Sequence, residues 1–210
     1  MRIVHLRRAF FVAFCLSAAQ LSVVAEEQTF NFKDPKGVNS ISFVLDSELE
    51  PIMGVAHGVS GEVKCDPKDM KKLRGKIVVA ADSVRTSNEL MTQKLHSDEW
   101  LDAKANPEIA FELKSVDSVK ADPKAKDSQV LEVSGSLTCH GITKDIKVTV
   151  TVTHLPGRLK DRLRGSEGDL LVVRSQFTVK RSDFKLGAPM PIVADEMQIR
   201  VAIVGQCPKS

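Results

Sequence analysis

Alternation of apolar and polar residues is the feature that most constrains this chain. The stretch DIKVTVTV, residues 145–152, has aliphatic residues at every even position and polar ones at every odd position. Successive side chains on a β-strand point to opposite faces, so this pattern predicts a strand with one buried face and one wet face. The same pattern recurs in six further stretches, at residues 41–46, 75–82, 108–116, 130–139, 175–184 and 197–204.

Two weaker stretches, residues 28–32 and 56–64, bring the total to eight or nine strands. Amphipathic antiparallel strands bury their apolar faces either in a sandwich or in a closed barrel. Closure removes exposed strand edges, and eight strands enclose a space that holds one small ligand. We expect an all-β protein with an eight-stranded antiparallel β-barrel, although the pattern alone leaves the sandwich open.

One interruption of the alternation is helical in character. Residues 86–104 carry apolar side chains at helical spacing, with Ser87 and Ser97 as candidate N-caps. Pro107 disfavours helix at the residue before it. The sequence therefore predicts one or two short helices lying across one end of the barrel.

The first 25 residues have the character of a secretory signal peptide. A basic stretch containing Arg2, Arg7 and Arg8 precedes a short apolar run that ends in small residues, with the expected cut after Ala25. Removing it leaves as many basic residues as the 27 acidic ones, so a general nucleic-acid role loses its support. We expect export with no membrane span after cleavage, and a single domain over residues 26–210.

The remaining cysteines, Cys65, Cys139 and Cys207, are an odd number for an exported protein. One bridge with one thiol left over and an intermolecular link that makes a homodimer are both compatible with this count. Their spacings fit no zinc motif, so we predict neither a metal site nor a cofactor.

Cys139 stands directly beside His140, which raises the question of a catalytic dyad. If Cys139 continues the inward series of its strand, His140 points outward or into the following turn, where Gly141 stands. The pair then marks a hairpin end, and we predict no catalytic residues. His57 shares its parity with Val55 and Val59, which places it either toward the interior as a ligand contact or in a bulge.

Three segments together resemble the YceI-like family. They are LHSDEWLDAKANPEIAF from Leu95 to Phe111, GSLTCHGITK from Gly135 to Lys144, and RSDF from Arg181 to Phe184. Lys185 stands where that family usually has glycine. Its early histidines are also missing here, where Asn39 and Asp46 occupy the corresponding places.

This resemblance implies an exported, lipocalin-like barrel, most often periplasmic and in some cases secreted, whose cavity binds a polyisoprenoid, an isoprenoid quinone or a similar lipid. On that basis the bound lipid is the ligand. Strand alternation, and for Trp100 its place in the expected end helix, predict the cavity contacts Phe43, His57, Ile77, Val79, Trp100, Phe111, Leu137, Val150, Phe177 and Ile199. A basic loop at the cavity mouth would attract a phosphate head group through Arg158, Lys160, Arg162 and Arg164. The alternative is a non-catalytic interaction protein with a barrel filled by side chains, acting through its loops or an intermolecular disulfide.

Overall fold

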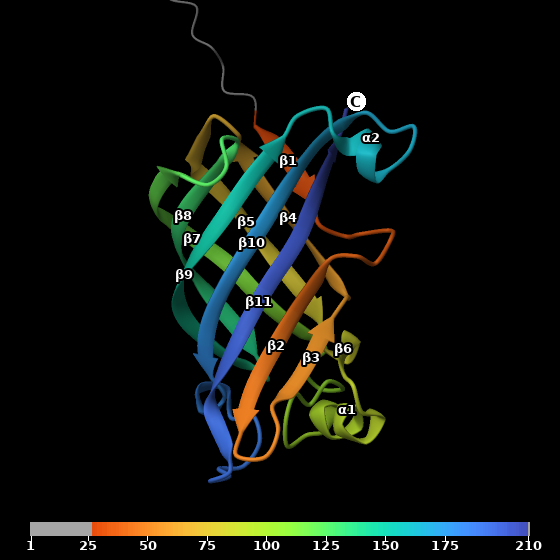
Figure 1. Ribbon diagram of the computed structural model, residues 1–210, viewed down its shortest axis with the longest axis vertical. Helices are drawn as coiled ribbons and strands as arrows, with labels where there is room; N and C mark the ends of the chain where they lie inside the picture. Colours follow the sequence, from red (N-terminus) through yellow and green to blue (C-terminus); the bar gives the residue numbers. More distant parts are fainter. Residues whose placement is uncertain (1–26, 210) are drawn as a thin grey trace, which may run out of the picture.

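A computed structural model of the protein describes residues 27–209, and its centre is a closed antiparallel barrel (Figure 1). Eight strands form the ring, which closes because β1 (Gln28–Asn31) pairs with both β4 and β11. The others follow in the order β4 (Val59–Asp66), β5 (Asp69–Ala80), β7 (Glu108–Ala121), β8 (Ser128–Cys139), β9 (Ile142–Leu155), β10 (Gly168–Lys180) and β11 (Val193–Pro208). The predicted eight-stranded barrel is confirmed.

Three further strands extend one end of this ring. The long strand β11 pairs with β1 near Gln206 and with β2 (Ser40–Ser47) nearer its start, and β3 (Ile52–Ala56) and β6 (Val84–Thr86) continue the sheet beyond β2. Strands β3 and β6 were not predicted, because IMGVA and VRT show no clear alternation of apolar and polar residues.

The helical segments lie at the two ends of the barrel (Figure 1). Helix α1 (Glu89–His96) begins after Asn88, whose side chain accepts a hydrogen bond from the Met91 N–H. The predicted N-cap at Ser87 is therefore wrong by one residue, and Ser97 caps the other end of this helix. Helix α2 (Leu159–Arg162) and the 3₁₀ turns η1 (Ala81–Ser83) and η2 (Arg181–Phe184) complete the fold.

The interior is solid at both ends. At the end that carries α2, a group of fully buried side chains that we call the plug consists of Phe30, Leu131 and Leu171. At the other end the buried Leu101, Phe184 and Leu186 belong to what we call the lid, residues 89–105 and 181–190. Between plug and lid, many inward side chains are only partly buried, and that is where the cavity lies.

Candidate ligand cavity

The barrel encloses a cavity of about 250 Å³. Its wall draws on strands all around the barrel and on the lid, and nearly all of the lining side chains are apolar. Only Ser42, Ser175 and Arg181 bring a polar side chain to it. A wall of this kind favours a hydrocarbon chain over any ligand that must form several hydrogen bonds.

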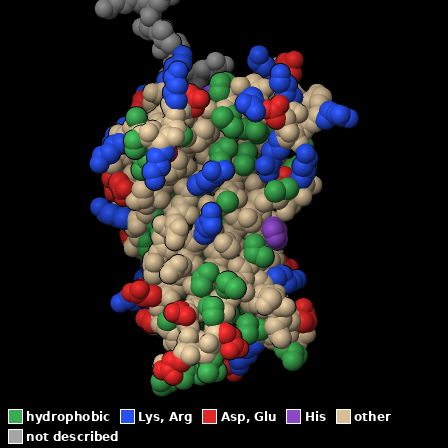
Figure 2. Space-filling model, in the orientation of Figure 1, with side chains coloured by type: hydrophobic (Ala, Val, Ile, Leu, Met, Phe, Trp, Pro, Cys, Tyr) green, Lys and Arg blue, Asp and Glu red, His purple; other side chains and the backbone are tan. Residues whose placement is uncertain are grey.

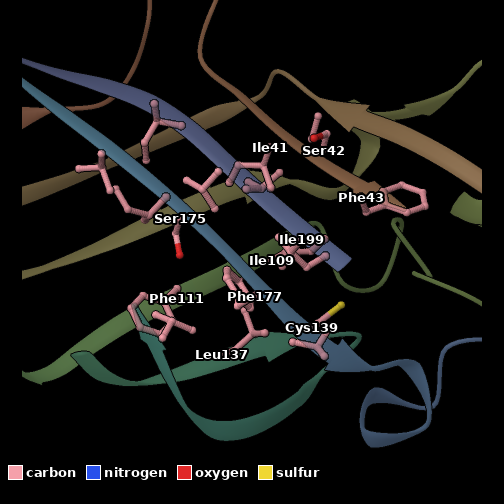
Figure 3. A pocket seen from close by; sticks show the side chains of 18 of the residues that line it. Ile41, Ser42, Phe43, Ile109, Phe111, Leu137, Cys139, Ser175, Phe177 and Ile199 are labelled. Atoms are coloured by element: carbon pink, nitrogen blue, oxygen red, sulfur yellow. The ribbon is translucent and has the colours of Figure 1, made fainter. Parts of the chain in front are cut away.

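Strand pairing places the large apolar side chains opposite one another. Ile77 pairs with Phe111, which pairs in turn with Leu137, so one row crosses β5, β7 and β8. A second row crosses β2, β11 and β10, where Phe43, Ile199 and Phe177 are paired. Figure 3 shows Phe111, Leu137, Phe177 and Ile199 converging on the same space.

Two glycines make room for the aromatic rings in these rows. A Cβ at Gly135 would lie 2.4 Å from the Phe111 ring, and one at Gly54 would lie 2.3 Å from the Phe43 ring. The outer ring atoms therefore occupy the space that a side chain at either glycine would take. Sequence reasoning missed this pairing, because Gly54 lies in an unpredicted strand and the partner of Gly135 depends on the register.

Nine of the ten predicted cavity residues line the cavity: Phe43, Ile77, Val79, Trp100, Phe111, Leu137, Val150, Phe177 and Ile199. Their contact with a ligand stays a prediction. His57 is the exception, because its side chain is exposed and does not line the cavity. The parity argument assumed one continuous strand, whereas β3 ends at Ala56 and β4 begins at Val59, which leaves His57 in the connection.

Arg181 is the residue that sequence reasoning overlooked. Its side chain is buried, and its guanidinium donates hydrogen bonds to the carbonyl oxygens of Leu186, Ala188 and Ala194, each at 3.0 Å. These bonds fasten the 186–188 segment of the lid to the start of β11. Arg181 therefore holds the lid in place through its Nε and Nη1 groups.

Trp100 lies in the lid and lines the cavity. Gly187 packs against it so closely that a Cβ there would lie 2.7 Å from the indole ring, and the Gly187 N–H donates to the Glu99 carbonyl at 2.7 Å. The backbone of Gly187 has φ of 68°, a conformation that favours glycine. The predicted role of Trp100 as a cavity contact in the lid agrees with this position.

The Cys139–His140 pair is a hairpin end. Cys139 pairs with Ile142 across a two-residue turn, in which His140 and Gly141 have φ of 50° and 70°. The thiol faces the cavity, where burial raises the pKa of Cys139 to about 12. His140 Nδ1 instead lies 3.1 Å from the Phe184 carbonyl, so the ring ties the hairpin to η2.

The predicted head-group loop does not border the cavity. Arg158, Lys160, Arg162 and Arg164 all lie in or beside α2, at the plug end, and none of them lines the cavity. Figure 2 shows Lys and Arg side chains gathered over this end, whereas Asp and Glu are frequent at the lid end. The prediction that this loop stands at the cavity mouth is wrong, because buried plug residues separate the two.

Arg162 has a structural role instead. Its Nη2 donates to Asp34 Oδ2 at 2.6 Å and to Asn39 Oδ1 at 3.1 Å, and the side chains of Arg162 and Asp34 are 16% and 2% exposed. Asn39 also bonds the backbone of Phe32 and Val204. Asn39 stands where the family usually has a histidine. Its hydrogen bonds connect the start of β2 with the end of β1, with β11 and with α2.

Other kinds of site find little support in the part of the chain that is described. Residues 27–209 contain no group of three or more His, Cys, Asp or Glu side chains placed to hold a metal ion. Nor does any helix within that range have the length and apolar character needed to cross a membrane. The predicted signal peptide, residues 1–25, lies outside the described residues.

A closed barrel around an apolar cavity defines a class of proteins that bind hydrophobic ligands. Within that class, the YceI-like domain matches residues 28–205, and the chain belongs to this family. The search of curated proteins found no match to this chain.

Solved structures show the same fold. The chain is similar to BcnA from Burkholderia cenocepacia at 24% identity, with a TM-score of 0.62 over 79% of this chain and 95% of that one. A polyisoprenoid-binding domain from Saccharophagus degradans, implicated in plant cell wall breakdown, has 13% identity and a TM-score of 0.61 over 87% and 100% of the two chains. The YceI protein of Campylobacter jejuni has 20% identity and a TM-score of 0.59 over 75% and 84%.

Proposed function

We propose that this protein is a non-catalytic carrier that holds one long apolar lipid of the isoprenoid type in its barrel, for transport, storage or sequestration. The observation that carries the proposal is the cavity wall, which is almost entirely apolar and has buried side chains at both ends. Membership of the YceI-like family supports it, as does the likeness to a domain described as polyisoprenoid-binding.

The mechanism is physical. Each methylene moved from water into the cavity contributes roughly 0.8 kcal/mol, so a branched hydrocarbon chain gains affinity without polar contacts. Selectivity would come from the shape of the cavity and from the aromatic rows across it. The alternative of a barrel filled by side chains does not agree with the observed cavity.

The compartment is part of the same proposal. A leader over residues 1–25 would direct the chain to the periplasm or outside the cell, where it would shield an insoluble lipid from water. Detection of a mature chain beginning at Glu26 in the periplasmic fraction supports this. A chain that keeps its first residues in the cytoplasm contradicts it.

Trp100 provides a direct binding assay. It is the only tryptophan, the chain has no tyrosine, and its ring lines the cavity. Retinol, a fluorescent isoprenoid alcohol that absorbs tryptophan emission, should quench Trp100 and saturate at one molecule per chain.

A pair of neighbouring substitutions provides the matched control. Val150→Lys places a charge on the cavity wall and should abolish the quenching, because an unpaired ammonium cannot be buried beside a hydrocarbon. Thr149→Lys, one residue away on the exposed face, should leave it unchanged. Equal quenching in both variants would count against a ligand in the barrel.

A further inference from the structure

The barrel wall itself offers a way into the cavity. Side chains that are at most 5% exposed lie at both ends of the cavity, Phe30 and Leu131 in the plug and Leu101 and Phe184 in the lid. A lipid therefore passes either through an end that must unpack or through a weak place between strands.

The pairing between strands β5 and β7 ends partway along both strands. Their pairing runs only from Ala80–Glu108 to Lys76–Glu112, although the strands have 12 and 14 residues. Beyond that point β5 is irregular against β4, and β7 shows two register shifts against β8, after Leu113 and after Val116. Bulges of this kind bend a strand and often accompany binding sites.

The cavity reaches this split. Leu73 and Gly75 from β5 and Leu113 from β7 line the cavity where the two strands separate, and all three are only partly buried.

One side chain spans the split. Lys71 Nζ donates to the Asp117 carbonyl at 2.7 Å and lies 3.4 Å from the Val116 carbonyl, so a flexible ammonium takes the place of missing strand pairing. Lys71 is exposed, and no other hydrogen bond or ion pair is found for it within residues 27–209. Exposed hydrogen bonds of this kind open locally at low cost.

The seam between β9 and β10 is also partly unpaired, because the two strands pair only from Leu155–Leu170 to Val150–Ser175. It differs from the β5–β7 split in regularity, since neither β9 against β8 nor β10 against β11 shows a register shift. Ser175 Oγ also donates to the Thr149 carbonyl at 2.7 Å across that seam.

We propose that the gap between Leu73–Gly75 of β5 and Leu113–Asp117 of β7 is the portal through which the lipid enters and leaves the cavity, with Lys71 as its latch. This inference rests on the proposed function. In this proposal the lid stays closed while the lipid passes. The hydrogen bonds from Arg181 to three backbone carbonyl oxygens agree with a fixed lid.

Stapling tests the portal. In a Cys207→Ser background, Lys71→Cys and Ser115→Cys would be joined by a short bismaleimide. As a control, Thr149→Cys and Gln176→Cys would carry the same staple across the regular β9–β10 seam. Cys65 and Cys139 should not react, because burial raises the pKa of each thiol to about 12. Retinol uptake and release are followed by Trp100 quenching.

The β5–β7 staple should slow both rates by at least about tenfold with little change in the equilibrium constant, and the control staple should not. Lys71→Met without a staple should speed both rates. Unchanged rates under the β5–β7 staple, with quenching intact, would overturn the portal and leave the binding function standing. Absence of retinol binding in the unstapled protein would overturn both.

Discussion

Replacing Arg162 with methionine tests whether the basic loop is structural or part of a ligand site. The substitution keeps the apolar stem but leaves the Asp34 carboxylate, whose side chain is 2% exposed, without its counter-charge. Breaking a buried pair in this way costs about 3–5 kcal/mol. We expect about 3 kcal/mol, because the N–H groups of Lys36, Val38 and Asn39 still bond that carboxylate.

Urea unfolding measures this cost, and Arg158→Met is the matched control. Arg158 lies in the same loop with a side chain that is 58% exposed, so its pairing with Asp161 should contribute less than about 1 kcal/mol. Both variants should still quench with retinol when folded, because neither side chain lines the cavity. Equal unfolding midpoints for the two variants would refute the structural role, and loss of binding in either would revive the head-group role.

The same pair gives a pH dependence. Burial alone raises the pKa of Asp34, but the backbone N–H groups and the Arg162 charge outweigh it and hold the pKa below its usual value of 3.8. The stabilisation is therefore present above pH 3.8 and disappears as the pH falls through the lower folded-state pKa. In Arg162→Met that pKa should rise toward 3.8, so titration of stability against pH should show a smaller acid loss that is complete at a higher pH.

Two further predictions concern the lid and the buried thiol. Gly187→Ala should lower the free energy of unfolding by roughly 1–3 kcal/mol, because φ is 68° and the new Cβ meets Trp100. The control is Gly37→Ala, where φ is 63° and no atom lies within 4 Å of the new Cβ. This variant should lose less stability in the same denaturation assay. A smaller loss for Gly187→Ala than for Gly37→Ala would contradict the packing of the lid. Cys139 should resist iodoacetamide at pH 8 in the folded protein and react on unfolding, because burial raises its pKa to about 12. Mass spectrometry of the labelled peptide measures this reaction. Rapid labelling of the native protein would mean that the cavity is open to water.

The sequence predicted the barrel well because alternation reports directly on which side of a strand is buried. It placed eight strand residues on the cavity wall for the same reason, and it identified the Cys139–His140 hairpin from the glycine in its turn. It failed for His57, where the chain breaks between two strands and parity no longer applies. Parity is a local rule, and it ends where the strand ends.

The remaining errors depend on contacts distant in sequence. Arg162 was assigned to a cavity mouth because its neighbours are basic, yet its position depends on Asp34, 128 residues earlier in the chain. Arg181 fastens the lid through carbonyl groups that no sequence pattern reveals. The Phe111 ring over Gly135 likewise depends on strand register.

The central claim is that the barrel carries a lipid, and its most direct test is to look for that lipid. The protein would be isolated without detergent from the cells that produce it, extracted with organic solvent, and analysed by mass spectrometry with Val150→Lys as a matched preparation. We predict a stoichiometric isoprenoid lipid in the natural protein and none in the variant. An empty natural protein that also leaves Trp100 unquenched by added retinol would contradict the account.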